Sequence, residues 1–183
     1  MNINHNYYLL YRLFNSIFLG LSIGTVMTIY APLQPSIYSL GGIALALGMM
    51  ALALLYEKIL TIEWFAFFSI LVEAIMVAVI LIFLIFIFDY KTALMIYIGY
   101  QLTFIFGGYL VRAETLFLSD PNMLKKIDIV KQIGTLAGMG FGYLVYQILN
   151  EKSNIEQVYD MHYLLILVQI MVLFFVVRAF RKS

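Results

Sequence analysis

The sequence has no cysteine among its 183 residues and only two histidines. The missing thiols exclude disulfides, thiolate metal sites and cysteine nucleophiles together. Neither His5 nor His162 has another His, Asp or Glu at metal-ligand spacing, so we predict solvated or interfacial rings, no metal site and no cofactor. The sequence also lacks a His-Glu-x-x-His motif, paired intramembrane aspartates and a nucleophile–base set, which argues against an enzyme.

Charge is the second scarcity, because only 11% of the residues are Asp, Glu, Lys or Arg. A soluble domain carries roughly twice that share. The net charge of +1 gives no basis for binding nucleic acid or an acidic substrate. With 64% hydrophobic residues, the chain needs the lipid bilayer as its solvent. Its Ile, Tyr, Phe and Asn are typical of bacteria with low genomic GC content, so we expect a multi-pass protein of the bacterial inner (plasma) membrane.

Six long apolar segments follow one another with short connections between them. A helix needs about 20 apolar residues to cross the hydrocarbon core of a bilayer. The segments therefore predict an all-α membrane protein with one six-helix domain over residues 1–183. The predicted spans are residues 8–30, 36–56, 64–88, 92–111, 129–149 and 163–177. The longest connection, residues 113–128, is expected to contain a short surface helix that begins at Pro121.

Lysine and arginine predict the orientation of these spans. If the N-terminus is cytoplasmic, that side receives nine of the eleven basic residues, and such a bias places both termini in the cytoplasm. It also argues against a protein that inserts in both orientations. The nine are Arg12, Lys58, Arg112, Lys125, Lys126, Lys131, Arg178, Arg181 and Lys182, and the other two are Lys91 and Lys152.

Small residues recur at four-residue spacing in two of the predicted helices. Gly134, Gly138 and Gly142 share one face of the fifth span, and Gly20 and Gly24 share one face of the first. Such faces let helix backbones approach closely. The contact is either packing within one subunit or a moving or inter-subunit surface.

Two predicted helices also carry polar faces that lipid alone does not explain. In the first span, opposite its glycines, these residues are Asn15, Ser22 and Thr25. In the fourth span they form a polar and aromatic stripe of Tyr97, Gln101, Phe104 and Gly108, flanked by Tyr100. The faces line either a cavity for a substrate or ion, or a set of interhelical hydrogen bonds.

Glu73 is the one ionisable residue deep inside a predicted span. A charge at that depth is unfavourable by about 2.5 kcal/mol or more, so the side chain is expected to face the bundle interior. It is either a site that couples transport to a proton or cation, or a protonated acid bonded to a neighbour such as Gln101 or Gln169.

The order of these features resembles one six-helix half of a major facilitator superfamily transporter. That family carries Gly-x-Leu-Ala-Asp-Arg-x-Gly after its second helix; residues 53–60 keep the leucine at Leu55 and the charge order at Glu57-Lys58. Gln101 stands where the family's fourth helix often has an arginine, and residues 134–142 are similar to its glycine-rich fifth helix. The resemblance implies transport by a homodimer, with a cavity on the two-fold axis lined by the first and fourth helices of each copy.

The leading hypothesis is therefore a half-size secondary transporter of a small solute or ion, working as a homodimer. The first alternative is a membrane-embedded substrate-binding subunit of a larger importer, with the fifth-span glycines as a docking face. The second is a scaffold or assembly factor in which Glu73 has a structural role.

Overall fold

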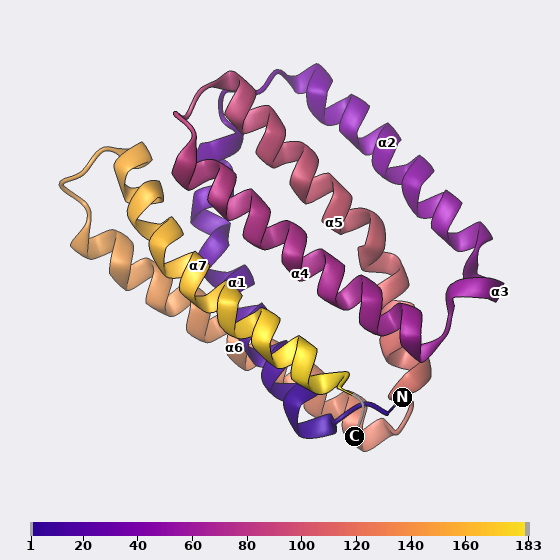
Figure 1. Cartoon of the computed structure of the whole chain (residues 1–183). Coiled ribbons are helices and arrows are strands. Elements are labelled where there is room, and N and C mark those ends of the chain that lie inside the picture. Colours follow the sequence, from indigo (N-terminus) through magenta and orange to yellow (C-terminus); the bar gives the residue numbers. More distant parts are fainter. Residues whose placement is uncertain (1, 182–183) are drawn as a thin grey trace.

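The computed structural model describes residues 2–181, and within this range the chain forms helices and no strand (Figure 1). Lys182, one of the basic residues assigned to the cytoplasm, lies outside the described range. The helices are α1 (His5–Tyr30), α2 (Pro35–Leu54), α3 (Tyr56–Ile59), α4 (Ile62–Ile85), α5 (Tyr90–Phe117), α6 (Pro121–Ile148) and α7 (Asn154–Ala179). The all-α prediction is confirmed.

Short polar side chains set where most of these helices begin. Asn4, Thr61 and Asp89 each accept a hydrogen bond from the backbone N–H three residues later, which satisfies a donor that the first turn leaves free. The Thr92 N–H also holds the pKa of the Asp89 carboxyl below its usual range. Pro35 and Pro121 stand at the start of α2 and α6, where the missing N–H of proline is tolerated.

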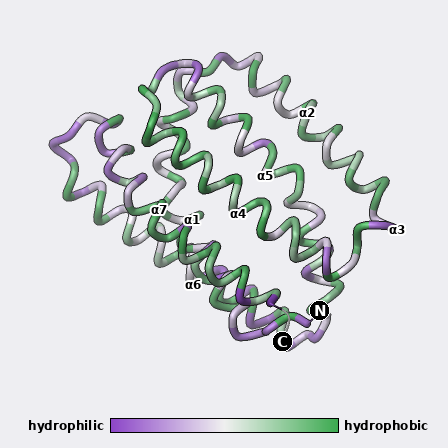
Figure 2. The backbone as a smooth tube through the Cα atoms, viewed as in Figure 1, coloured by the Kyte–Doolittle hydropathy of each residue, from purple (hydrophilic) through white to green (hydrophobic). Residues whose placement is uncertain are grey.

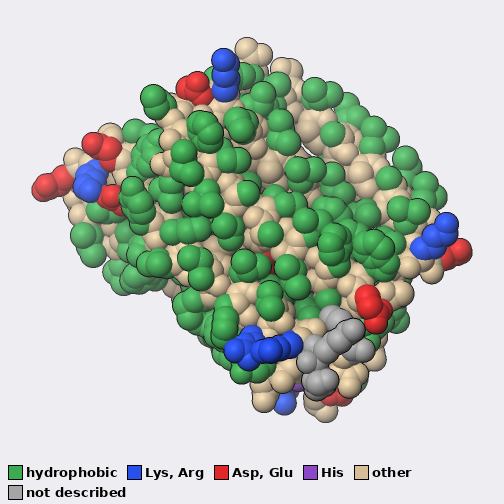
Figure 3. All heavy atoms as spheres, in the orientation of Figure 1, with side chains coloured by type: hydrophobic (Ala, Val, Ile, Leu, Met, Phe, Trp, Pro, Cys, Tyr) green, Lys and Arg blue, Asp and Glu red, His purple; other side chains and the backbone are tan. Residues whose placement is uncertain are grey.

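In the described part of the chain, five helices are long and apolar enough to cross a membrane, namely α1, α2, α4, α5 and α7. Hydrophobic residues dominate along these helices, and polar residues gather at the ends of the bundle (Figure 2). The space-filling view shows hydrophobic side chains over most of the visible face, with charged ones near its rim (Figure 3). The chain is a multi-pass membrane protein. The predicted fifth span, inside α6, is not among these five helices because its glycines, lysine and glutamines lower its hydropathy.

The fourth connection differs from the prediction. It was expected to occupy residues 113–128 with a separate surface helix, but α5 continues to Phe117 and α6 runs without a break from Pro121 to Ile148. The reason is local: no glycine or proline stands between Val111 and Leu118 to end α5. The polar residues after Pro121 form the first turns of a long helix, and the true connection is only three residues long.

The six long helices pack in a repeating pattern. Helix α1 packs against α6 and α7, helix α5 packs against α2 and α4, and α4 and α7 pack on each other. If α1 is exchanged with α5, α2 with α6 and α4 with α7, the same pairs of packed helices result. Because successive helices alternate in direction, the two groups of three run in opposite senses (Figure 1).

The glycines of α1 and α6 lie where these two helices meet. A Cβ on Gly20 would lie 2.5 Å from the Thr135 carbonyl oxygen, and one on Gly134 would lie 2.6 Å from the carbonyl oxygen of Leu13. Gly138 faces Ile17 and Gly142 faces Leu21, so the two helices run parallel with a constant register. Gly24 extends the contact to the Tyr146 ring. The small residues therefore serve close packing within one subunit.

Helix α2 is packed far more loosely than its counterpart α6. None of its residues is buried, and its main neighbour is α5. A largely apolar cavity of about 390 Å³ lies between α2 and α5, lined among others by Leu45, Leu94 and Ile105. The two groups of three helices are thus similar in arrangement but unequal in tightness.

Candidate functional site

A second cavity of about 390 Å³ opens between α1, α4 and α5, near the middle of the bundle. Four residues expected from the sequence to lie on a substrate or ion pathway contribute to its lining, namely Asn15, Ser22, Glu73 and Tyr100. Most of the remaining lining is aliphatic or aromatic. This cavity is the candidate site.

Glu73 lies on the cavity wall with an exposed fraction of 1%. It is about 17 Å along α4 from the first residue of that helix, at 1.5 Å per residue. Its Oε1 accepts hydrogen bonds from the Tyr11 hydroxyl at 2.9 Å and from Asn15 Nδ2 at 3.0 Å. Its Oε2 accepts one from Gln169 Nε2 at 2.8 Å. Donors from α1 and α7 thus converge on one carboxyl group of α4.

The orientation of the Gln169 amide decides the chemistry of this group. Its Nε2 also donates to the backbone carbonyl of Glu73 at 3.1 Å, and a carbonyl can only accept. The amide therefore presents a donor to Oε2. With donors on both oxygens, the arrangement satisfies an ionised carboxylate; a protonated acid needs Tyr11 or Asn15 to turn and accept. Gln169, one of two neighbours suggested from the sequence, is the partner, and Gln101 makes no bond to Glu73.

Hydroxyl groups near the cavity bond to their own helices. Ser22 donates to the Leu19 carbonyl at 2.9 Å, and Thr25 donates to the Ser22 carbonyl at 2.7 Å. Thr25 is fully buried and does not line the cavity. Ser22 and Thr25 therefore do not donate to Glu73, and the amide donor that α1 presents to Glu73 is Asn15.

The polar stripe of α5 divides between the two cavities. Tyr100 and Phe104 line the candidate site, whereas Tyr97 and Gln101 line the apolar cavity next to α2. Gly108 faces the end of the Met49 side chain on α2. The stripe is the ridge of α5 that separates the two cavities, so its members share a helix face without sharing a site.

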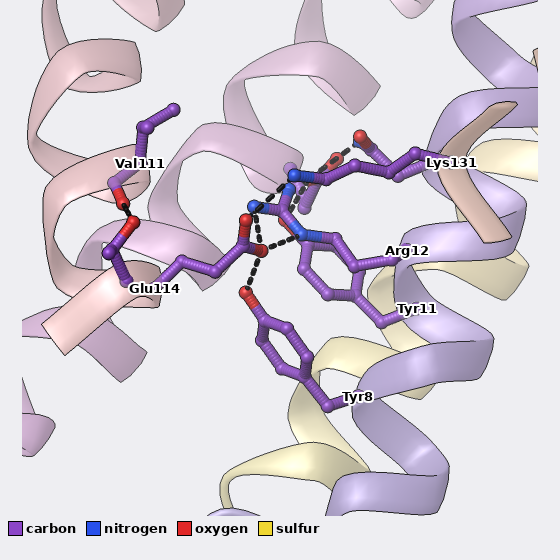
Figure 4. Close-up of polar contacts among 9 residues, drawn as sticks. Tyr8, Tyr11, Arg12, Val111, Glu114 and Lys131 are labelled. Atoms are coloured by element: carbon purple, nitrogen blue, oxygen red, sulfur yellow. Dashed lines mark hydrogen bonds and ion pairs between the residues drawn. The ribbon is translucent and has the colours of Figure 1, made fainter. Parts of the chain in front are cut away.

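A second polar cluster, absent from the sequence-based site, joins α1, α5 and α6 (Figure 4). Its centre is Glu114 on α5, which is buried. This carboxylate accepts hydrogen bonds from the Tyr8 hydroxyl at 2.6 Å, from Lys131 Nζ at 2.7 Å, and from the Arg12 guanidinium. It thereby joins α5 to α1 and α6, whose contacts with α5 are otherwise sparse.

The two polar clusters meet at α1. The Arg12 guanidinium lies over the Tyr8 ring at 5.6 Å and over the Tyr11 ring at 5.3 Å from the centroids. Tyr11 in turn donates to Glu73. A continuous chain of polar and aromatic contacts therefore runs from Glu114 to the carboxylate on the cavity wall.

Sequence reasoning missed Glu114 because it was assigned to a connection outside the membrane. The available signal was the absence of a helix-breaking residue after Val111, which keeps Glu114 on the same helix as the cavity residues. Arg12 and Lys131 were counted only as markers of orientation. Their common partner follows from the α1–α6 register, which brings both cations to one side of α5.

The expectation for His162 was wrong. Its ring has an exposed fraction of 2%, stacks on Phe83 at a centroid distance of 3.9 Å, and places Nδ1 2.7 Å from the Val158 carbonyl oxygen. It is part of the α4–α7 core and not a solvated residue. In residues 2–181 no group of three or more His, Cys, Asp or Glu is arranged to hold a metal ion.

The chain matches no protein-family model, no curated protein and no solved structure.

Proposed function

We propose that this protein is a half-size secondary transporter of a small solute, working as a homodimer. The observation that carries the proposal is the mid-bundle cavity between α1, α4 and α5, with Glu73 and Asn15 on its wall. A buried carboxylate at that depth is unfavourable in a chain that only anchors in lipid. In a cavity that recognises a solute, the Glu73 carboxylate has a function as a binding group.

The proposal includes a sixth span within α6. Helix α6 runs parallel to the membrane-spanning α1 over about two turns, from the Leu13–Gly134 contact to the Leu21–Gly142 contact. Gly134, Gly138 and Gly142 lower its hydropathy, but they face α1 and not lipid. With six spans, both termini lie on one side, and the lysine and arginine bias favours the cytoplasm.

The packing pattern supports the resemblance to half of a major facilitator transporter. Each half of such a transporter contains two groups of three helices in inverted orientation. The exchange of α1, α2 and α4 with α5, α6 and α7 follows the same scheme. The two halves of such a transporter are related by an axis along the membrane normal, so two copies of this chain in one orientation give a comparable assembly with a cavity on the axis.

Cysteine labelling tests transport without knowledge of the solute, because the chain has no native cysteine. Ser22→Cys places a thiol on the cavity wall. A membrane-impermeant maleimide should label it in both right-side-out and inside-out vesicles, since a transporter opens its cavity to each side in turn. Leu136→Cys, on a 74% exposed position of α6, is the matched control and should resist labelling from both sides.

Labelling of Ser22→Cys from one side only would contradict transport and would fit a substrate-binding subunit. Failure to label from either side would fit a scaffold or assembly factor. The homodimer is tested separately by the mass of the protein in lipid nanodiscs, where a monomer would contradict it. The alternative of a larger importer has lost one support, because Gly134, Gly138 and Gly142 are covered by α1 and are not a free docking face.

A further inference from the structure

Among residues 2–181, the cavity between α1, α4 and α5 is lined by one carboxylate and no cationic side chain. Glu73 contributes to this lining, and none of the described Lys, Arg or His residues does. We propose that this cavity binds a lipophilic organic cation of single positive charge. This substrate class rests on the proposed transport function and makes it specific.

The Glu73 carboxylate is held by hydrogen bonds and not by an ion pair. Its three side-chain donors, on Tyr11, Asn15 and Gln169, are all neutral groups. Arg12, the cation nearest to it along α1, forms its ion pair with Glu114. The site therefore offers a bound cation a carboxylate without a counter-ion in contact, at a wall of low dielectric constant where opposite charges attract far more strongly than in water.

The rest of the wall suits a lipophilic cation whose positive charge is spread over many atoms. Four aromatic rings and two thioethers contribute to the lining: Phe18, Tyr30, Tyr100, Phe104, Met27 and Met76. Ring faces attract cations, and the flexible methionines adapt to irregular shapes. The Tyr30 and Tyr100 rings stand edge to face at 6.1 Å, so they hold each other in place at the cavity.

Other solute classes fit this lining poorly. A sugar needs many hydrogen-bond partners, but Ser22 and Thr103 donate their hydroxyls to backbone carbonyls of their own helices. An organic anion or a zwitterionic amino acid carries a carboxylate that finds no cation in the lining. A bare metal ion needs several free oxygen ligands, whereas both Glu73 oxygens already accept hydrogen bonds. The volume of about 390 Å³ is that of a site for a small organic molecule.

Equilibrium binding of tetraphenylphosphonium to the full chain in lipid nanodiscs tests the proposal. Tetraphenylborate, which has the same shape and the opposite charge, is the matched ligand control, and empty nanodiscs correct for partition into lipid. The protein should bind the cation in saturable fashion and bind the anion at least about tenfold more weakly, because the Glu73 carboxylate attracts the one and repels the other. Equal binding of both ions, or no saturable binding of the cation, would overturn the proposal.

Two variants locate the site. Glu73→Gln keeps the size of the side chain and should weaken cation binding about tenfold or more, while Glu151→Gln, an exposed loop carboxylate, should leave it unchanged. Phe104→Leu removes a half-exposed ring of the wall and should weaken binding several-fold even if the Glu73 variant does not fold. Unchanged binding in Phe104→Leu would place the cation elsewhere and refute the site.

This experiment is independent of the test of transport. Binding at equilibrium requires no movement of the cavity, and the labelling of Ser22→Cys requires no ligand. Loss of one result with the other intact therefore separates a wrong substrate class from a wrong function.

Discussion

The α1–α6 contact allows a stability prediction with a control on the same helix. Gly134→Ala would place a Cβ 2.6 Å from the Leu13 carbonyl oxygen and 2.8 Å from the Ser16 Cβ. Ordinary contacts begin near 3.4 Å, so the α1 and α6 backbones must separate by about 0.8 Å. Gly140→Ala adds the same methyl group six residues further along α6, where it would lie in open space.

Both variants gain helix propensity, up to about 1 kcal/mol in each case. Only Gly134→Ala also overpacks the interface, which destabilises by about 1–3 kcal/mol. The difference in the free energy of unfolding between the two variants therefore isolates the overpacking. Gly142→Ala, whose Cβ would lie 3.7 Å from its nearest neighbours, should resemble Gly140→Ala.

The assay is reversible unfolding in mixed micelles with increasing dodecyl sulfate, followed by the fluorescence of the single tryptophan, Trp64. Gly134→Ala should unfold at a lower dodecyl sulfate fraction than the other two variants. If Gly134→Ala and Gly140→Ala unfold together, α1 and α6 do not pack as closely as described, and the argument for a sixth span loses its main support.

Three further predictions follow from the polar clusters and the topology. Glu114→Gln should destabilise the protein by about 3–5 kcal/mol, because it leaves the Arg12 guanidinium buried without a counter-ion. Lys131→Met, at the more exposed ion pair, should lower the free energy of unfolding by at most about 1 kcal/mol. Equal losses for the two variants in the same unfolding assay would contradict this ranking. Asn154→Cys should react with impermeant maleimide only from the extracellular side, and labelling from the cytoplasm would overturn the topology. Glu73→Gln should still insert but lose accumulation of tetraphenylphosphonium driven by a pH gradient in proteoliposomes, and full accumulation in this variant would rule out a coupling role.

Hydropathy was sufficient to predict the helical class and the membrane environment. The positions of α1, α2 and α4 agree with the predicted spans to within a few residues, because long apolar runs, Pro35 in the first turn of α2 and the Thr61 cap of α4 are local signals. The end of α5 was missed because Glu114 and the residues around it are polar yet remain helical. Hydropathy measures how well a segment is solvated by water. A polar helix turn that is buried in a protein contact therefore has the same low hydropathy as a loop, and the two cannot be told apart.

The candidate site was only partly predictable for a different reason. Glu73 could be recognised as a buried charge from its own surroundings in the sequence, but its partner Gln169 lies 96 residues away. Choosing between Gln169 and Gln101 requires knowing that α4 packs on α7. Helix periodicity likewise could group Tyr97 with Phe104 but could not reveal that α2 covers one side of that face and leaves the other side to the cavity.

The partners of α1 have a consequence for how the protein is made. Glu114 follows Arg12 by 102 residues, so during translation at 5–20 residues per second α1 waits roughly 5–20 s for its counter-ion. Over that interval a helix with a guanidinium and an amide on its surface sits in the bilayer without its main partners. We expect the insertion machinery to retain α1 until α6 and α7 emerge, and biogenesis, more than the finished fold, to be the step most sensitive to changes at Arg12.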